Sequence, residues 1–156
     1  MIILGAAAVL LTCYCGYEKI DDIICSIAGI FALAICLFPC GNGNYAGIGV
    51  GPFSFWGMTE ATTSWFHNIS AFAFFALLSF NSLFLFTKSN GIMTENKKKR
   101  NIIYRVCGIG MLASFLFLPL PIPCITWIVE FFALAFFGIS WLTKADCYPW
   151  LFCDKK

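Results

Sequence analysis

Charged residues are scarce in this chain, and their scarcity excludes an ordinary soluble domain. Only 12% of the 156 residues are Asp, Glu, Lys or Arg, whereas 60% are hydrophobic. A soluble domain carries about 25% charged residues, and a small protein has a large surface for its volume that polar groups must cover. The apolar surface of this chain therefore needs lipid instead of water, and we predict an integral membrane protein in contact with membrane lipids.

Motifs for catalysis and for metal binding are also missing. The sequence has no GxSxG, no HExxH and no Gly-rich phosphate loop, which are signatures of hydrolases, metalloproteases and nucleotide-binding proteins. It has one histidine and nine cysteines, but no CxxC with a matching partner, so we expect no metal site and no cofactor. A net charge of +2 is too small to indicate a nucleic-acid partner.

Long apolar segments dominate what is present. Five of them approach the roughly 20 residues that a membrane-spanning helix needs: 2–15, which is short, 23–38, 65–87, 102–118 and 124–143. Backbone groups in lipid need internal hydrogen-bond partners, so such segments must be helical. We predict an all-α membrane protein in which residues 1–156 form a single domain, a bundle of five transmembrane helices.

Prolines lie where two of these helices should end. Pro39 follows the second segment, and Pro119, Pro121 and Pro123 follow the fourth. Proline has no backbone N–H and clashes with the preceding helical turn, so it marks helix ends. The three alternating prolines predict a tight turn, which makes the fourth and fifth helices antiparallel neighbours.

Basic residues occur on one side of the predicted bundle only. All ten lie at position 19, between positions 88 and 105, or from position 144 onward. With five spans these regions share one side, whereas Met1, residues 39–64 and the proline turn share the other side, which has no Lys or Arg. Short loops rich in Lys and Arg stay in the cytoplasm. We therefore predict a multi-pass protein with its N-terminus outside and its C-terminus in the cytoplasm.

Polar groups inside a bilayer are costly and mark candidate sites. His67, close to Ser64, lies at the outer end of the third helix, and Glu130 lies about 10 Å beyond Pro123 at 1.5 Å per residue. Both fall in the outer half of the bilayer. They form either a pair that handles protons or binds a ligand, or an interfacial histidine and a carboxylate that hydrogen-bonds between helices.

Two further pairs follow from the predicted topology. Asp21 and Asp22 form either a solvated cytoplasmic turn or an inner-side ion pair with Arg105, whose side chain is also long enough to reach the interface alone. Cys40 and Cys124 are both expected at the outer surface. There they form either a disulfide or two reduced thiols.

Short motifs over nearly the whole chain carry a resemblance. They are GYEKIDD at 16–22, residues 28–39, His67 with residues 70–71 and 74–75, residues 100–101, YRVCG at 104–108, Trp127 with Glu130, and GISWL at 138–142. Together they resemble a group of uncharacterised small bacterial polytopic membrane proteins. The resemblance implies a plasma (inner) membrane location and adds weight to His67, Glu130 and Arg105, but it implies no activity. Members of that group begin with a further segment and a fuller first helix, so we expect an N-terminally shortened member.

Three functions are compatible with these observations. The first, which we favour, is a non-enzymatic membrane bundle that acts with a membrane-protein partner or as a homo-oligomer. The second is a small transporter or channel-like oligomer with His67 and Glu130 near its pathway. The third is an intramembrane lipid-modifying enzyme that uses the same two residues as acid and base.

Overall fold

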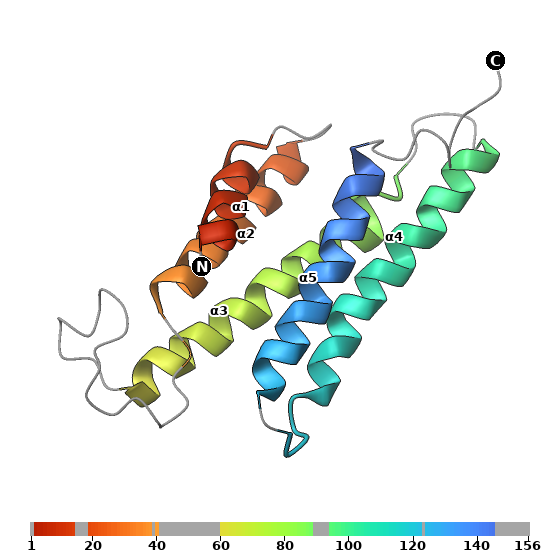
Figure 1. Cartoon of the computed structure of the whole chain (residues 1–156). Helices are drawn as coiled ribbons and strands as arrows, with labels where there is room; N and C mark the ends of the chain where they lie inside the picture. Colours follow the sequence, from red (N-terminus) through yellow and green to blue (C-terminus); the bar gives the residue numbers. More distant parts are fainter. Residues whose placement is uncertain are drawn as a thin grey trace. The chain divides into compact units, whose positions relative to one another are not determined.

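The computed structural model describes residues 2–14, 19–38, 40, 60–88, 94–122 and 124–145, and these residues form helices and turns without any strand (Figure 1). The segment 41–59, most of the predicted outer loop, lies outside them. The helices are α1 (Ile2–Thr12), α2 (Lys19–Leu37), α3 (Glu60–Phe80), α4 (Glu95–Ser114) and α5 (Ile125–Lys144). A π-helical segment, η2 (Asn81–Leu85), continues α3, and a 3-10 turn, η3 (Phe115–Phe117), continues α4.

Four of these helices are long and apolar enough to cross a membrane. They are Lys19–Leu37, Ala61–Leu85, Glu95–Phe117 and Ile125–Lys144. The predicted all-helical architecture is thus confirmed, together with four of its candidate spans. The fifth, α1, has 11 residues and is about 16 Å long at 1.5 Å per residue, which is roughly half of the 30 Å hydrocarbon core.

The chain divides into two compact units, Met1–Leu77 and Leu78–Lys156, and the single domain stays a prediction. In the first unit, α1 packs against α2. Gly29 makes this contact close, because a Cβ there would lie 2.5 Å from Thr12 Cγ2 and 2.8 Å from the Ala8 carbonyl oxygen. Small residues allow helix backbones to approach in this way, and Ala28 and Ala32 are both fully buried.

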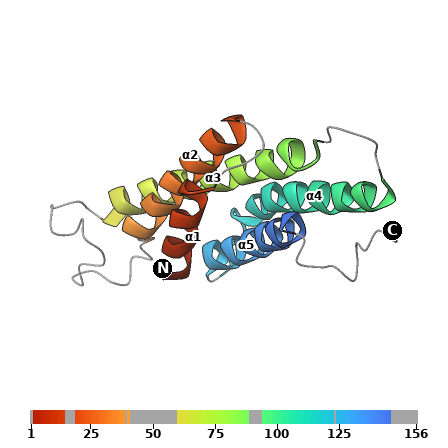
Figure 2. The same cartoon turned by 90° about the horizontal axis from the view of Figure 1, so that it is seen from above.

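The second unit contains the predicted helical hairpin. α4 and α5 run side by side and antiparallel, joined by the proline turn (Figures 1 and 2). Glycine again permits close packing: a Cβ on Gly108 would lie 2.5 Å from Leu83 Cγ of η2, and a Cβ on Gly110 would lie 2.8 Å from the ring of Phe136 on α5. The sequence therefore predicted the partner helices and their direction correctly.

The helix boundaries differ from the predicted ones mainly at polar ends. α2 begins at Lys19 rather than at residue 23, and its first turn contains Asp21 and Asp22, whose negative charges favour the positive end of the helix dipole. α4 begins at Glu95 rather than at residue 102, because the Thr94 side chain accepts a hydrogen bond from the Lys97 N–H and caps the helix. An apolar segment marks the part of a helix in lipid, not the whole helix.

Candidate functional site

His67 lies on a buried face of α3. Its side chain is 4% exposed, and Thr63, Ser70 and Phe74 are buried on the same face, as their spacing of three and four residues requires. Ser64, which we grouped with His67, is half-buried beside this face. The buried polar neighbours on the helix are therefore Thr63 and Ser70, which the sequence interpretation did not select.

His67 holds the end of α2 by a hydrogen bond. Its Nδ1 lies 2.7 Å from the carbonyl oxygen of Phe38, one residue beyond the end of α2. The last carbonyls of a helix lack partners within the helix. A carbonyl only accepts hydrogen bonds, so Nδ1 carries the proton and donates it. Phe66 adds an apolar contact, because its ring stacks on that of Phe38 with centroids 5.2 Å apart. This hydrogen bond gives His67 a structural role at the end of α2, and both alternatives for its function stay predictions.

Glu130 lies on α5 in the second unit. It is the sixth residue of the helix, about 8 Å from its first residue at 1.5 Å per residue, and it is half-buried. It therefore lies in the half of α5 next to the proline turn. His67 belongs to the first unit and Glu130 to the second, so their pairing stays a prediction.

The other two predicted pairs are also divided between the units. Asp21 and Asp22 belong to the first unit and Arg105 to the second, and Cys40 and Cys124 are divided in the same way. Asp21 is buried, Asp22 is half-buried and Arg105 is exposed, while Cys40 is half-buried and Cys124 is exposed. The ion pair and the disulfide therefore stay predictions, and the two carboxylates have a local role at the start of α2.

A cluster of buried hydroxyl groups joins four elements in the second unit: the end of α3, η2, α4 and α5. Ser79, at the end of α3, donates to the Gly108 carbonyl on α4 at 2.7 Å. Ser82 on η2 donates to the Tyr104 carbonyl at 2.8 Å and lies 2.7 Å from the Ser140 hydroxyl on α5. Because Ser82 has a single hydroxyl hydrogen, Ser140 must be the donor in their contact. These three serines are each 1% exposed.

The sequence interpretation missed this cluster, although a signal was available. Within the apolar stretch 65–87, the string Ser79-Phe80-Asn81-Ser82 has three polar residues in four positions, as residues 67–70 do, and the π-helical segment begins inside it, at Asn81. The amide N–H of Phe86 reaches the carbonyl of Asn81 at 3.0 Å, a bond between residues five apart. Such π-turns often lie at functional sites.

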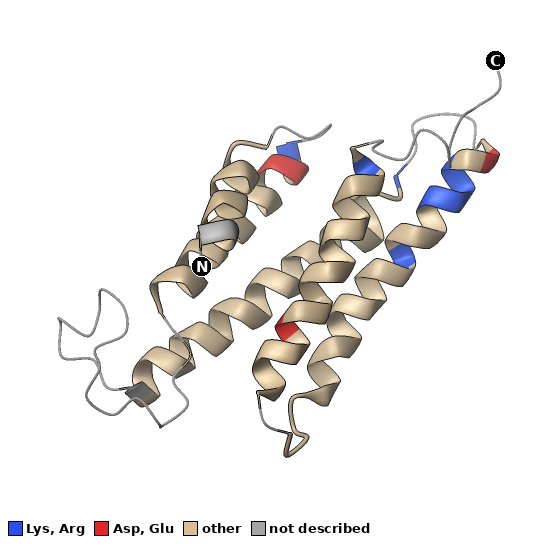
Figure 3. Cartoon of the chain, in the orientation of Figure 1, with Lys and Arg blue, Asp and Glu red and all other residues tan. Residues whose placement is uncertain are grey.

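Basic side chains gather at one end of the second unit, around Phe86. Lys97 Nζ donates to the Phe86 carbonyl at 3.0 Å, and Lys144 Nζ lies 5.1 Å from the centre of the Phe86 ring. Asn101 Nδ2 donates to the Thr87 carbonyl at 3.3 Å. Figure 3 shows the Lys and Arg residues at this end of α4 and α5. The side chains bind carbonyls that would otherwise lack partners at the end of η2.

The lysine run contains residues of two kinds. Lys97 is half-buried and points to the end of η2, whereas Lys98 and Lys99 are exposed. Lys98 pairs with Glu95 at 2.7 Å across one helical turn. The exposed cations stand where the apolar part of α4 gives way to polar residues, which suits an interface with anionic headgroups.

Comparison with known proteins gives no further assignment: no protein-family model, no curated protein and no solved structure matches the chain. Within the described ranges, no group of three His, Cys, Asp or Glu side chains is placed to hold a metal ion.

Proposed function

We propose that this chain is a non-enzymatic integral membrane protein that acts with a membrane-protein partner or as a homo-oligomer. It crosses the bilayer five times, with the N-terminus outside and the C-terminus in the cytoplasm, in a bacterial plasma membrane. The single observation that carries the orientation is the clustering of cations around Phe86, at one end of the second unit. Residues 106–143, which include the proline turn at the other end, have no Lys or Arg. Such an asymmetry is typical of a cytoplasmic and an outer end.

The non-enzymatic role is supported by what the buried polar groups bind. His67 donates to a backbone carbonyl, and so do Ser79 and Ser82. Each of these side chains holds two helical elements together, which is the ordinary role of polar residues between membrane helices. A general acid or base would instead need to reach a substrate atom within hydrogen-bond distance.

The experiment places a small uncharged epitope tag at each end of the full chain. We expect the Met1 tag to bind antibody on intact cells and the Lys156 tag to bind only after the membrane is opened. Alkaline carbonate should leave the chain in the membrane pellet. A Met1 tag in the cytosol, or an intact chain recovered without detergent, would contradict the proposal.

A further inference from the structure

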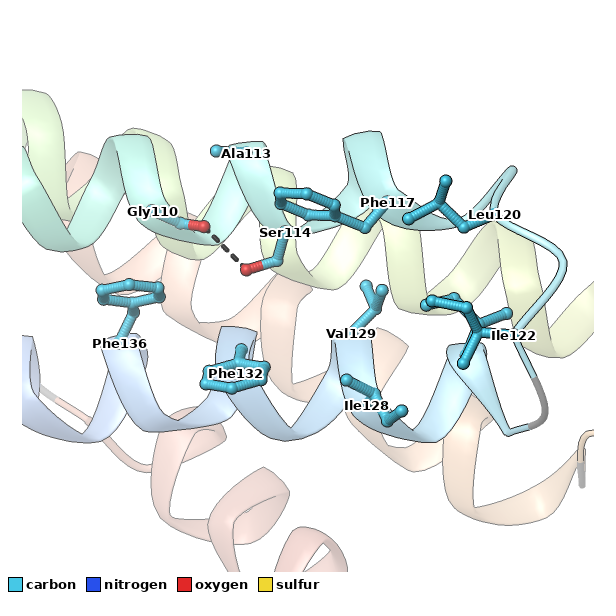
Figure 4. A pocket seen from close by; sticks show the side chains of 11 residues that line it. Gly110, Ala113, Ser114, Phe117, Leu120, Ile122, Ile128, Val129, Phe132 and Phe136 are labelled. Atoms are coloured by element: carbon cyan, nitrogen blue, oxygen red, sulfur yellow. Dashed lines mark hydrogen bonds between the residues drawn. The ribbon is translucent and has the colours of Figure 1, made fainter.

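An apolar groove lies between α4, η3 and α5 at the proline-turn end of the second unit. Its volume is about 470 Å³, within the roughly 300–1,000 Å³ of ligand sites in proteins. Figure 4 shows Phe132, Phe136 and Val129 on α5 along one side and Phe117 near the turn. Among the described lining residues only Ser114 has a polar side chain, and its hydroxyl donates to the Gly110 carbonyl at 2.8 Å. The groove therefore suits an occupant without polar groups.

The length of the groove matches one leaflet of a bilayer. Its lining on α5 extends over residues 125–136, about 16 Å at 1.5 Å per residue. The hydrocarbon core is about 30 Å thick, so a single leaflet accounts for about half of that. The groove begins at the proline turn, which is the end of the hairpin away from the lysines.

The volume of the groove and the absence of basic residues in the hairpin indicate which kind of apolar molecule it can bind. A whole helix of this length, with a diameter of about 10 Å, has a volume of roughly 1,200 Å³, so a neighbouring helix would enter the groove only with the side chains of one face. An extended hydrocarbon chain is narrow enough. No Lys or Arg occurs in residues 106–143, so this hairpin offers no cation to an anionic headgroup above the turn.

We propose that the groove binds one acyl chain of a phospholipid with a zwitterionic headgroup, in the leaflet that contains the proline turn. The assignment of this leaflet as the outer one rests on the proposed function. The carbonyl end of the acyl chain lies near Ile122 at the turn, and its methyl end lies near Phe136. The lipid would then be part of the face that the hairpin presents to a partner.

Gly110 sets the depth of the groove at its inner end. A Cβ at this position would lie 2.8 Å from two ring atoms of Phe136, and both residues line the groove. Gly110→Ala therefore adds a methyl group to the lining and displaces the Phe136 ring, which changes the shape of the inner end of the groove. Gly138→Ala is the matched control on α5, because a Cβ there meets no atom within 4 Å.

The test uses the full chain in phosphatidylcholine nanodiscs and phosphatidylcholine with a photoreactive diazirine in one acyl chain. A diazirine near the chain terminus should label the peptide that contains Phe136, and a diazirine near the carbonyl should label Ile122. Both labels should exceed severalfold those at Phe131 and Ile139, which are exposed on α5 but do not line the groove. Gly110→Ala should lower the terminal label severalfold, and Gly138→Ala should leave it unchanged.

A second variant keeps the test decisive if Gly110→Ala does not fold. Ile128→Trp fills the groove from a half-buried lining position, and Ile139→Trp is its control on the exposed surface. Only the first should abolish the label. Equal labelling at all exposed apolar positions, loss of the label when phosphatidylglycerol competes, or crosslinks between two copies through Phe117 would each overturn the proposal.

The same preparation separates this proposal from the proposed topology. The order of labels along α5 depends on distance from the proline turn and not on which side of the membrane the turn faces. If the end tags are reversed but the labels keep their order along α5, the proposed topology is wrong and the lipid-binding proposal stands. If the end tags lie as expected but the labelling is uniform, the lipid-binding proposal is wrong and the proposed topology stands.

Discussion

The imidazole of His67 has a structural role that can be measured, because it donates a hydrogen bond to the Phe38 carbonyl beyond the end of α2. In His67→Phe an aromatic ring is kept but the donor is lost. Leaving a buried acceptor without a partner costs about 1–3 kcal/mol. Because this contact is only partly buried, we expect a loss of stability of about 1 kcal/mol by SDS titration in mixed micelles. Asn68→Ala, at the exposed neighbour, should change little. Unchanged stability in His67→Phe would contradict the structural role of His67.

Gly108 tests the close contact between α4 and η2. In Gly108→Ala the new methyl group lies 2.5 Å from Leu83 Cγ and 3.3 Å from the Ser79 carbonyl oxygen, so α4 must move away. Overpacking of this kind costs about 1–3 kcal/mol. Gly138→Ala, where the space is open, should gain up to about 1 kcal/mol from helix propensity. The two variants should shift the unfolding midpoint in opposite directions, and a shift in the same direction would argue against this packing.

Single residues show what the sequence can and cannot indicate. His67 was predictable because one imidazole in an apolar stretch is conspicuous and costly. Ser79, Ser82 and Ser140 were not selected, because isolated hydroxyl groups hardly change the hydropathy of a Phe-rich segment. Their importance arises from the facing carbonyls of α4, which no local pattern encodes.

The lysine run at the start of α4 tests an entire element. Lys97→Met keeps the apolar stem but removes the bond to the Phe86 carbonyl. We expect a loss of about 1 kcal/mol, near the lower end for a bond to a charged group, because the site is half-exposed. Lys98→Met breaks only an exposed pair with Glu95, which contributes little to stability because water and salt screen it.

Thermal unfolding in nanodiscs measures both variants. A stability loss in Lys98→Met as large as that in Lys97→Met would contradict the division of the run into one inward and two exposed lysines. Neither variant should change the yield in the membrane fraction, because most of the cations at this end remain.

The ends of elements were less predictable than the elements themselves. Hydropathy located α2, α3, α4 and α5, because lipid demands long apolar helices. It placed the start of α4 seven residues too late, since residues 95–101 are polar and helical at once. The helix signal was present in Thr94 and Glu95, a capping residue followed by an acidic residue in the first turn.

At the scale of the whole molecule, cysteine accessibility tests the proposed topology independently of tags. In variants that retain either Cys124 or Cys153 as the single cysteine, a membrane-impermeant maleimide should label only Cys124 on intact cells. Cys124 is exposed next to the proline turn, and Cys153 follows the last span. After the membrane is opened, both should react. Labelling of Cys153 on intact cells would place the C-terminus outside.

The sequence does not predict which side chains of the two units contact each other. Charge asymmetry indicates the side of the membrane on which His67, Glu130 or Arg105 lies. It does not indicate the direction in which each residue points around its helix axis, and this direction decides whether two side chains meet. Among the contacts that the structure describes within each unit, the sequence analysis predicted only the α4–α5 hairpin, where prolines constrain the packing.

The π-turn at Asn81–Leu85 contains one residue more than the α-turn it replaces. Deleting a single residue such as Leu83 would restore the ordinary pitch and rotate everything that follows by about 100° about the axis. Phe86 would then lose the contact of its carbonyl with Lys97 and that of its ring with Lys144. The additional residue thus sets the direction in which the following residues point around the helix axis. With it, the Ser79 and Ser82 hydroxyls and the terminal carbonyls all bond to α4.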